Sequence, residues 1–353
     1  MGKLTLYLEV LKALSIRRNG GYNLMEKNNH ALTPSEILSL WNVYLSETMT
    51  THVTTLFLEQ AEDPEIKDLL EIALKVSKEG VAAAESFLKN AGHPLPDGFS
   101  EHDINWSAPK KYSDHFVLLI KNKLVQDAVV VSTMALGSST RKDIRNFFEK
   151  QLQQGSRIIN ICLDLIYKKG LYHPLHIPFP EESEKISSSQ SFLGSFFVGT
   201  RPVSTAEIFN LVANFQSTEV LSVFFKSFAQ FELSKENGIK QHFERGAEIM
   251  DKHLEIFQTL LSKNNLPQLP TWESELTDSI IAPFSEKVIL FKSSLMLSAT
   301  ASRYGVALST VVRKDIGVDF MRLMVETLKY AEDTINLLIK KKYLTQHPLA
   351  LTK

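Results

Sequence analysis

Hydrophobic residues recur along this chain at helical spacing. Apolar positions between Ile37 and Leu45 lie three or four residues apart, and the pattern continues to about residue 60. Thr33, Pro34 and Glu36 stand just before it, in the order of an N-cap, a first-turn proline and a capping-box acid. The pattern predicts a first helix that begins near residue 34.

The same signals predict a second helix and a third. Asp63 and Pro64 open the second, and Gly92 with the proline that soon follows stops it. The third is expected over about residues 113–136, and residues 93–111 form a long connection before it. A four-helix bundle with one crossover along its length, as in ferritin-like folds, needs such a connection, whereas an up-down-up-down bundle needs only short turns.

A fourth helix is expected to begin at Thr140 as N-cap, with Asp143 in capping-box position. Residues 168–170, two lysines and a glycine, end it with cations at the negative end of the helix dipole. No segment of strand period competes inside the helical part of the chain. The one clean alternation, residues 4–10, lies ahead of the first helix.

The four-helix pattern occurs twice. Arg141-Lys142-Asp143-Ile144 returns as Arg313-Lys314-Asp315-Ile316, and the segments around these two tetrads align without gaps at an offset of 172 residues. The gapless match begins just after the long connection. The expected fold class is all-α: two tandem ferritin-like four-helix bundles with long crossover loops between their second and third helices. We expect the two bundles to pack about a pseudo-twofold axis.

The repeats divide the chain into four parts. They are an extension (1–30), a first ferritin-like bundle (31–170), a linker (171–202) and a second bundle (203–353). Residues 190–197 of the linker are apolar enough to be expected to dock on a bundle. The codons for Gly20-Gly21 could form a bacterial ribosome-binding sequence three codons before Met25, so translation is expected to start at Met25 and residues 1–24 to be leader.

Composition and charge narrow the function. A net charge of −1 argues against a general nucleic-acid binder, which needs a basic excess to neutralise phosphates. The single cysteine, Cys162, excludes an internal disulfide, and its apolar helical context predicts a buried, inert thiol. No run approaches the roughly 18 apolar residues of a membrane-spanning helix. The expected localisation is cytoplasmic, with spore association left open.

A ferritin-like bundle raises the hypothesis of a carboxylate-bridged di-metal centre. Such a centre needs a Glu-x-x-His pair on each of two helices. None of the ten histidines has an acidic residue three positions before it. The usual centre is therefore not predicted, although Asp127 and carboxylates of the first two helices could form an irregular one. We assign no catalytic, cofactor-binding or metal-ligating residue and expect no cofactor.

Four histidines stand in contexts that could suggest a site. His253 and His52 have no acidic partner on their own helix face, and are expected to be hydrogen-bonded or at the surface. His173 and His176 have the spacing of metal ligands, but the proline between them places them in the linker. A structural interpretation is favoured for all four.

Two further patterns have competing interpretations. Glu326 and Tyr330, one turn apart, could belong to a metal or radical site, but more often form a solvated face with one amphipathic tyrosine. The tetrad arginines, Arg141 and Arg313, could bind an anion, but local pairing and the helix start explain them better. Because the tetrads lie at equivalent ends of the two repeats, we expect them to help dock the bundles on each other.

Several motifs together resemble the bacterial domain of unknown function 3231 family. They are Thr-Pro-Ser-Glu-Ile at 33–37, Gln-Ser-Phe-Leu-Gly at 190–194, Thr-Arg-Pro at 200–202, Thr-Trp-Glu-Ser-Glu-Leu-Thr-Asp-Ser at 271–279, Pro-Phe-Ser-Glu-Lys at 283–287, Tyr-Gly-Val-Ala-Leu at 304–308 and Lys-Tyr-Ala-Glu-Asp at 329–333. The resemblance covers about residue 30 to the end. It implies an endospore-forming bacterium and tandem ferritin-like bundles, distantly related to spore coat protein F. It brings no established activity, and Lys292 stands where members often have His.

These observations favour a structural or interaction protein, sporulation- or spore-coat-related, over an enzyme. The alternative is a metal-binding or oxidoreductase bundle with a nonstandard carboxylate and histidine site. A third reading is a small-ligand carrier that uses the interface between the bundles. The identity of any protein partner is left open; no nucleic acid and no membrane span are expected.

Overall fold

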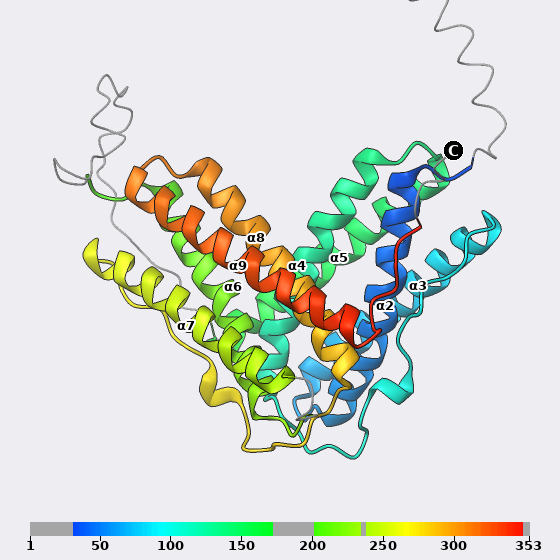
Figure 1. Cartoon of the computed structure of the whole chain (residues 1–353), viewed down its shortest axis with the longest axis horizontal. Coiled ribbons are helices and arrows are strands. Elements are labelled where there is room, and N and C mark those ends of the chain that lie inside the picture. The colour runs from blue at the N-terminus through cyan, green and yellow to red at the C-terminus, as the bar shows by residue number, and fades with distance from the viewer. Residues whose placement is uncertain (1–30, 172–200, 234–237, 349–353) are drawn as a thin grey trace, which may run out of the picture.

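The computed structural model describes residues 31–171, 201–233 and 238–348, which form two four-helix bundles (Figure 1). The first bundle contains α2 (Pro34–Gln60), α3 (Pro64–Asn90), α4 (Asp114–Ser138) and α5 (Lys142–Lys168). The second contains α6 (Thr205–Gln230), α7 (Ile239–Lys263), α8 (Glu286–Thr310) and α9 (Lys314–Lys340). No strand occurs in these residues, which confirms the all-α tandem fold. The predicted extension and the apolar linker stretch lie outside the described residues.

Each bundle contains a crossover along its length, as predicted. The carboxylate of Asp114, at the start of α4, accepts hydrogen bonds from the backbone N–H groups of Glu62 and Asp63, at 2.8 and 2.7 Å. The start of α4 therefore lies beside the start of α3. Because α3 ends at the opposite end of the bundle, residues 91–113 must return along its whole length.

The predicted caps are confirmed at α2 and α3 but not at α5. Thr33 and Glu36 form the capping box of α2, and Asp63 accepts from two backbone N–H groups of α3. The prediction that Thr140 caps α5 is wrong, because Arg141 occupies the N-cap without a side-chain cap bond. The N–H groups of Thr140 and Arg141 instead donate to the Glu36 carboxylate, at 2.8 and 2.9 Å. A side chain of α2 thus accepts the hydrogen bonds of the backbone N–H groups at the start of α5.

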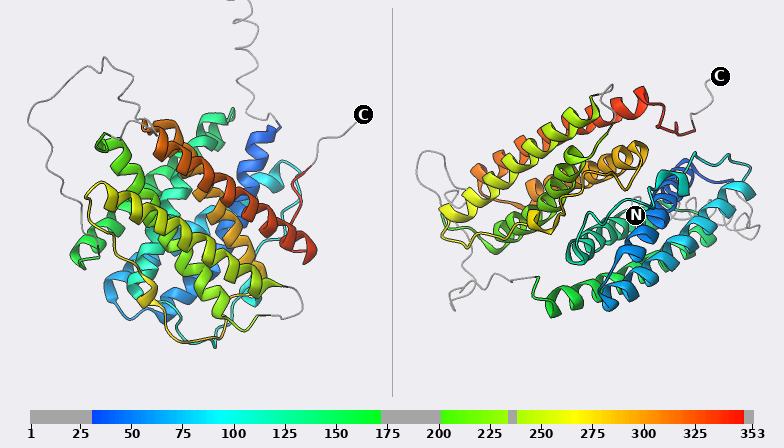
Figure 2. Two further views of the ribbon diagram at one scale, coloured as in Figure 1. Left: turned by 60° about the vertical axis from the view of Figure 1, so that its left-hand side comes forward. Right: turned by 90° about the horizontal axis from the view of Figure 1, so that it is seen from below.

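The two bundles form the arms of a V (Figure 1), and Figure 2 shows them side by side from below. In α3, α5, α7 and α9 the buried residues keep to one helical face. In contrast, α2, α4, α6 and α8 carry apolar residues around most of their circumference. A helix that is apolar on several faces must be covered on several faces. These four helices pack within their own bundle on one side, and near the closed end of the V they pack against the other bundle.

The crossover loops of the two bundles pair with each other. Ile104 forms an isolated antiparallel bridge with Phe284, and Tyr112 forms another with Leu276. At the offset of 172, Ile104 corresponds to Leu276 and Tyr112 to Phe284, so each bridge is the pseudo-twofold copy of the other. This reciprocal pattern is that of an isologous interface. It supports the expected pseudo-twofold packing within one chain.

The same symmetry extends the repeat into the loops. Short 3-10 turns, Glu101–Asp103 and Glu273–Glu275, lie 172 residues apart. The backbone N–H of Ser113 donates to the Glu275 carbonyl at 3.0 Å, and that of Ser285 donates to the Asp103 carbonyl at 2.8 Å. The gapless match therefore begins within the crossover, earlier than the sequence motifs indicated.

The hydrophobic core is continuous across the bundle interface. One cluster of buried residues draws on both bundles, and its aromatic centre contains Phe57, Tyr112, Phe224 and Phe284. The Phe57 ring lies edge-on to Tyr112 and Phe284, with centroids 6.0 and 5.9 Å apart. A smaller cluster fills the outer part of each arm. The closed end of the V is thus one core shared by two repeats.

The tetrads do not dock the bundles, contrary to the prediction. They begin α5 and α9, beside the starts of α2 and α6, which Figure 1 shows at the two separate tips of the V. Arg141 pairs with Asp143 at 2.6 Å, and Arg313 pairs with Asp315 at 2.5 Å. The side chain of Arg313 also donates to Asn264, again within its own bundle. The prediction failed because the bundles pack against each other at the end where their crossover loops pair, and the tetrads lie at the opposite end.

Candidate functional site

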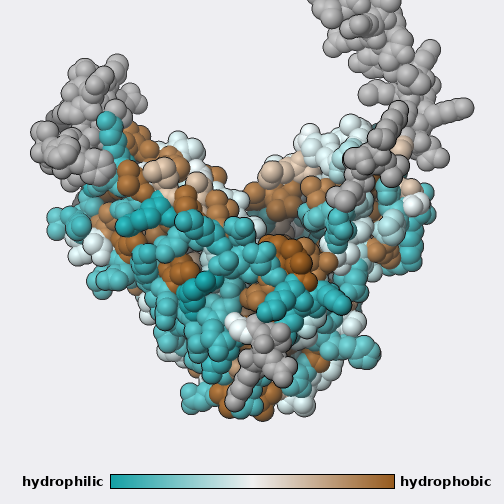
Figure 3. Space-filling view, viewed as in Figure 1, coloured by the Kyte–Doolittle hydropathy of each residue, from teal (hydrophilic) through white to brown (hydrophobic). Residues whose placement is uncertain are grey.

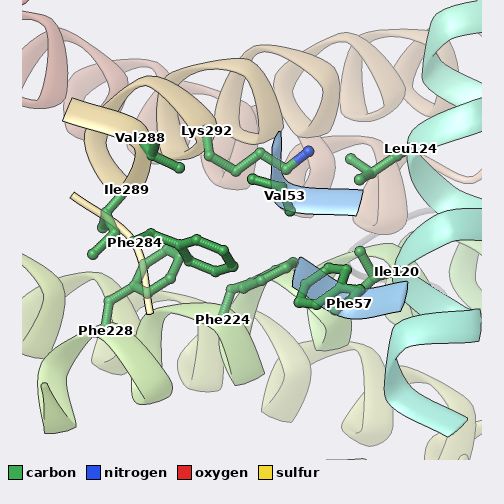
Figure 4. A pocket seen from close by; sticks show the side chains of 10 residues that line it. All are labelled: Val53, Phe57, Ile120, Leu124, Phe224, Phe228, Phe284, Val288, Ile289 and Lys292. Atoms are coloured by element: carbon green, nitrogen blue, oxygen red, sulfur yellow. The ribbon is translucent and has the colours of Figure 1, made fainter. Parts of the chain in front are cut away.

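Charged side chains gather where α2, α4 and α8 meet at the bundle interface. Lys121 of α4 is 4% exposed, and its Nζ donates to Thr54 Oγ1 of α2 at 2.9 Å. Lys292 of α8 extends toward Val53 and Leu124, which belong to the other bundle (Figure 4). Two lysines from different repeats therefore approach one another in a mostly apolar setting.

Lys292 borders two adjoining small cavities. One is lined by aliphatic and aromatic side chains, among them Phe57, Phe224 and Phe284 (Figure 4). The other adds Lys121 to the lining. Each cavity has about 20 Å³ of space. That is room for about one water molecule, whereas ligand pockets are typically some hundreds of Å³.

Carboxylates flank the lysines on both sides. Asp127 of α4 forms an ion pair with Arg303 of α8, across the bundle interface. Glu47 of α2 is partly buried and hydrogen-bonds Ser77 of α3. Glu47 and Asp127 thus place carboxyl groups near the two lysines. The ion pair of Asp127 with Arg303 also joins the two bundles at this site.

Burial controls the protonation of this cluster. It lowers the pKa of Lys292 to about 7, and the nearby Lys121 charge acts in the same direction. Burial also lowers the pKa of Lys121 to about 8 and raises those of Glu47 and Asp127. Each shift disfavours the charged form, as expected when ionisable groups leave water.

The chemistry available to Lys292 follows from that environment. A lysine whose pKa is lowered by desolvation carries a neutral, nucleophilic amine near pH 7, the form used in Schiff-base catalysis. The adjoining cavities, however, have space for about one water. The arrangement supplies a reactive amine without room for a substrate beside it.

Bundle two contains a separate buried polar network. His253 of α7 is fully buried, with Nδ1 3.2 Å from the Tyr304 hydroxyl and Nε2 3.1 Å from the Glu326 carboxylate. Thr218 bonds the other side of that hydroxyl at 2.7 Å, and Lys252 donates to Glu326 at 2.8 Å. The network connects α6, α7, α8 and α9.

The network holds a neutral imidazole. Burial lowers the pKa of His253 to about 4, although the Glu326 bond acts the other way. We assign the Nε2 proton to the bond with the carboxylate, so that Nδ1 accepts from Tyr304. Burial would raise the pKa of Glu326, but the bonds from Lys252 and His253 outweigh it and lower that pKa. Every polar group named here has a partner, which is the pattern of a network that fixes packing.

The first bundle fills the equivalent space differently. Matching the C-terminal ends of α3 and α7 places Gly80 opposite His253, and matching the starts of α2 and α6 places Glu47 opposite Thr218. A Cβ added at Gly80 would lie 3.2 Å from Glu47 Cγ, so the glutamate occupies the room that an imidazole takes in the second bundle. The two bundles share a backbone plan but not an interior site.

The structure corrects the interpretation of Glu326 and Tyr330 as a solvated face. Tyr330 is 2% exposed, and its hydroxyl donates to the backbone carbonyl of His242 at 2.7 Å. Its ring also stacks on the imidazole of His242. Glu326 bonds His253, a partner that lies 73 residues away in the sequence. No local pattern could have indicated that pairing.

The cysteine and the other histidines considered in the sequence analysis do not form a site in the described residues. Cys162 is fully buried, as predicted, and burial raises the pKa of its thiol to about 12. His52 is partly buried beside the crossover loop, and burial lowers its pKa. His173 and His176 lie outside the described residues. In the described part of the chain, no group of three or more His, Cys, Asp or Glu is placed to hold a metal ion.

Comparisons with known proteins give a family but no activity. A family model described as "Protein of unknown function (DUF3231)" matches residues 21–178 and 191–353. No curated protein matches the chain. A crystal structure described as a "putative spore coat protein" from Bacillus halodurans is 20% identical, with a TM-score of 0.37. That match covers 44% of this chain and 98% of the other. Among the helices of the described residues, none is long and apolar enough to cross a membrane.

Proposed function

Because the chain belongs to the DUF3231 family of proteins of unknown function, we propose its role from its construction: a structural or interaction protein. The observation that carries the proposal is the filled centre of the molecule. The two bundles share one core, and the cavities beside Lys292 hold about one water. A protein whose best-placed reactive group has no space beside it is better suited to present its surface than to turn over a substrate.

The surface supports the same role. Val130, Val131 and Met134 are exposed on the outer half of α4, and Val306 is exposed on α8. Figure 3 shows hydrophobic colour on the inner faces of both arms of the V. Exposed apolar side chains that gather on one region mark interaction sites more often than single scattered ones do.

We propose a spore setting from the family resemblance of the sequence motifs. The test is to raise an antibody against the chain and to probe mother-cell, coat and core fractions of sporulating cells. Enrichment in the coat or core fraction is the expected result. An even distribution in vegetative cytoplasm, without change on sporulation, would contradict the spore role.

The alternative is a metal-binding or oxidoreductase bundle, and His253 with Glu326 is the observation that favours it. The two ligand types lie 3.1 Å apart inside the second bundle. Metal analysis of protein purified without a histidine tag separates the two functions. Stoichiometric iron or manganese that is lost in Glu326→Gln would establish the alternative and overturn the structural role.

The carrier function loses support from the geometry of the interface. The cavities there are lined mostly by packed aromatic and aliphatic side chains and are water-sized. A carrier needs to enclose most of its ligand in a preformed cavity. We therefore keep the structural role as the proposal.

A further inference from the structure

A stripe of large hydrophobic side chains is exposed along α9. Val318, Met321, Val325 and Leu328 are 43–50% exposed. Their spacing of three, four and three residues places them on one side of the helix, as in the seam of a coiled coil. The helix runs across the front of the molecule in Figure 1, and Figure 3 shows hydrophobic patches on this face.

The stripe is separate from the face that packs α9 into its bundle. The core face carries Ile316, Phe320, Leu323 and Tyr330, all buried. A helix on the surface of a bundle needs one apolar face only. The second face is therefore not explained by the fold of this bundle.

The first bundle supplies an internal comparison. Helix α5 has the same bounds as α9 at the offset of 172, and the stripe positions correspond to Asn146, Glu149, Gln153 and Ser156. All four are polar and exposed. The same helix in the same fold is thus stable with a polar outer face, and the apolar stripe is a property of the second repeat alone.

Charges of opposite sign flank the four stripe residues of α9. Lys314 stands one turn before Val318, and Glu332 stands one turn after Leu328. Both are exposed, and neither forms an ion pair within the described residues. Along α9, these four apolar residues therefore lie between a cation, Lys314, and an anion, Glu332.

Two copies of this face complement each other when the two helices run in opposite directions. In an antiparallel pair of α9 helices, Val318 faces Leu328 of the other copy and Met321 faces Val325. The same register places Lys314 opposite Glu332 at both ends of the seam. A parallel pair would instead set Lys314 against Lys314 and Glu332 against Glu332, which is repulsive. These two end charges thus favour an antiparallel pair of α9 helices over a parallel one.

We propose that α9 is a self-association surface, on which a second copy of this chain docks antiparallel through Val318, Met321, Val325 and Leu328. The contact is isologous, so it closes as a dimer with twofold symmetry. One helix from each chain buries an area at the low end for specific interfaces, so the dimer is weak and depends on concentration. The proposal is independent of the spore role, because it concerns the purified chain alone.

Sedimentation equilibrium over a wide range of protein concentration tests the dimer. The chain is expected to pass from monomer to dimer as concentration rises. Val325→Glu, which buries a carboxylate in the seam, is expected to raise the dissociation constant by roughly tenfold or more. Gln153→Glu, at the equivalent position of α5, is the matched control and is expected to leave it unchanged.

A charge-reversal cycle tests the register. Lys314→Glu and Glu332→Lys alone each place like charges together twice in the dimer, and each is expected to weaken it roughly three- to tenfold. The double variant restores opposite charges and is expected to recover the wild-type constant. Far-UV circular dichroism and thermal melts check that each variant is folded.

Three outcomes would overturn the proposal. The wild-type chain could remain monomeric at every concentration, which would leave the stripe for a different protein. It could form a dimer that Val325→Glu does not weaken, which would place the contact elsewhere. The double charge reversal could fail to rescue either single variant, which would exclude the antiparallel register.

Discussion

At the residue scale, Lys292 and Gly246 show how much the interior constrains single side chains. Lys292 holds an amine among Phe57, Phe224 and other apolar groups, at a cost that the fold must offset. Gly246 of α7 leaves the space that the Tyr330 hydroxyl occupies. Lys292 is an ionisable group in a place where its charged form is disfavoured, and Gly246 leaves room for the hydroxyl of a tyrosine that forms a hydrogen bond.

Lys292→Met is expected to stabilise the protein at pH 6, by up to about 1–4 kcal/mol, the range found when buried ion pairs are replaced by apolar residues of similar volume. The folded lysine loses its proton above about pH 7, whereas the unfolded one keeps it to about 10.5. The unfolded state therefore binds more protons in that window, and wild-type stability rises with pH relative to the variant. Urea unfolding from pH 6 to pH 10 measures the shrinking difference. The exposed Lys240→Met is the control, and a pH-independent gain would contradict the prediction.

Gly246→Ala is expected to destabilise the protein by about 2–4 kcal/mol, because a buried overlap adds to the loss of a hydrogen bond. The new Cβ would overlap the Tyr330 hydroxyl and lie 2.7 Å from its Cζ. Gly305→Ala on α8 is the matched control, since its nearest neighbour is Met324 Sδ at 3.7 Å. That change is expected to be neutral or stabilising by up to about 1 kcal/mol. Thermal unfolding of both variants compares them, and equal effects would argue against the packing account.

At the element scale, one carboxylate in each bundle joins the first helix to the last. Glu207 is fully buried and accepts from Ser204 at the start of α6 and from the backbone N–H of Arg313 at the start of α9. Arg201 adds a bond of 2.7 Å to the same carboxylate. Glu36 has the corresponding place in the first bundle. In each bundle, one carboxylate therefore accepts hydrogen bonds from backbone N–H groups at the starts of two helices. Those N–H groups have no acceptor within their own helix.

Glu207→Gln is expected to lower the free energy of unfolding at pH 7 by about 3 kcal/mol. Burial would raise the pKa of Glu207, but bonds from Arg201 and backbone N–H groups outweigh it and lower that pKa to about 2. The stabilisation is complete above the unfolded pKa of 4.5 and is lost as pH falls toward 2. Denaturant unfolding at pH 7, 4 and 2 should show the variant converging on wild type. The exposed Glu255→Gln should differ little at any pH, and a constant gap for Glu207→Gln would refute the linkage.

At the scale of the whole molecule, the crossover loops lock two repeats into one unit. Lys111 of the first loop is 1% exposed, and its Nζ donates to Gln230 Oε1 and to the carbonyls of Thr277 and Ser279, at 2.7–2.8 Å. All three acceptors belong to the second repeat. With the shared core, these bonds make the V a single cooperative structure rather than two linked domains.

Lys111→Met is expected to cost about 2–4 kcal/mol, because it leaves buried acceptors without a donor. Lys110→Met is the matched control and should cost less than about 1 kcal/mol, since the ion pairs that Lys110 forms within the described residues are with Glu62 and Asp114 of its own bundle. Wild-type unfolding is expected to give one transition by fluorescence and by circular dichroism. Two separate transitions in the wild type would show that the bundles unfold independently.

The sequence alone determined the all-α fold, the crossover and the pseudo-twofold, through its helical periodicity, its helix-end signals and its 172-residue repeat. These are properties of nearby residues, or of one segment compared with another, so the sequence contains them directly. The caps of α2 and α3 were predictable because an N-cap side chain bonds its own helix. The N–H groups at the start of α5 instead bond Glu36, which lies 104 residues before Thr140.

Only the tertiary structure decided the sites. Glu326 meets His253 across 73 residues, and Lys121 approaches Lys292 from the other repeat, so no spacing rule could pair them. The structure also showed that the tetrads lie at the tips of the V and that the apolar stripe of α9 faces outward. A helical pattern indicates that a face is apolar, but which surface covers it depends on how the helices pack.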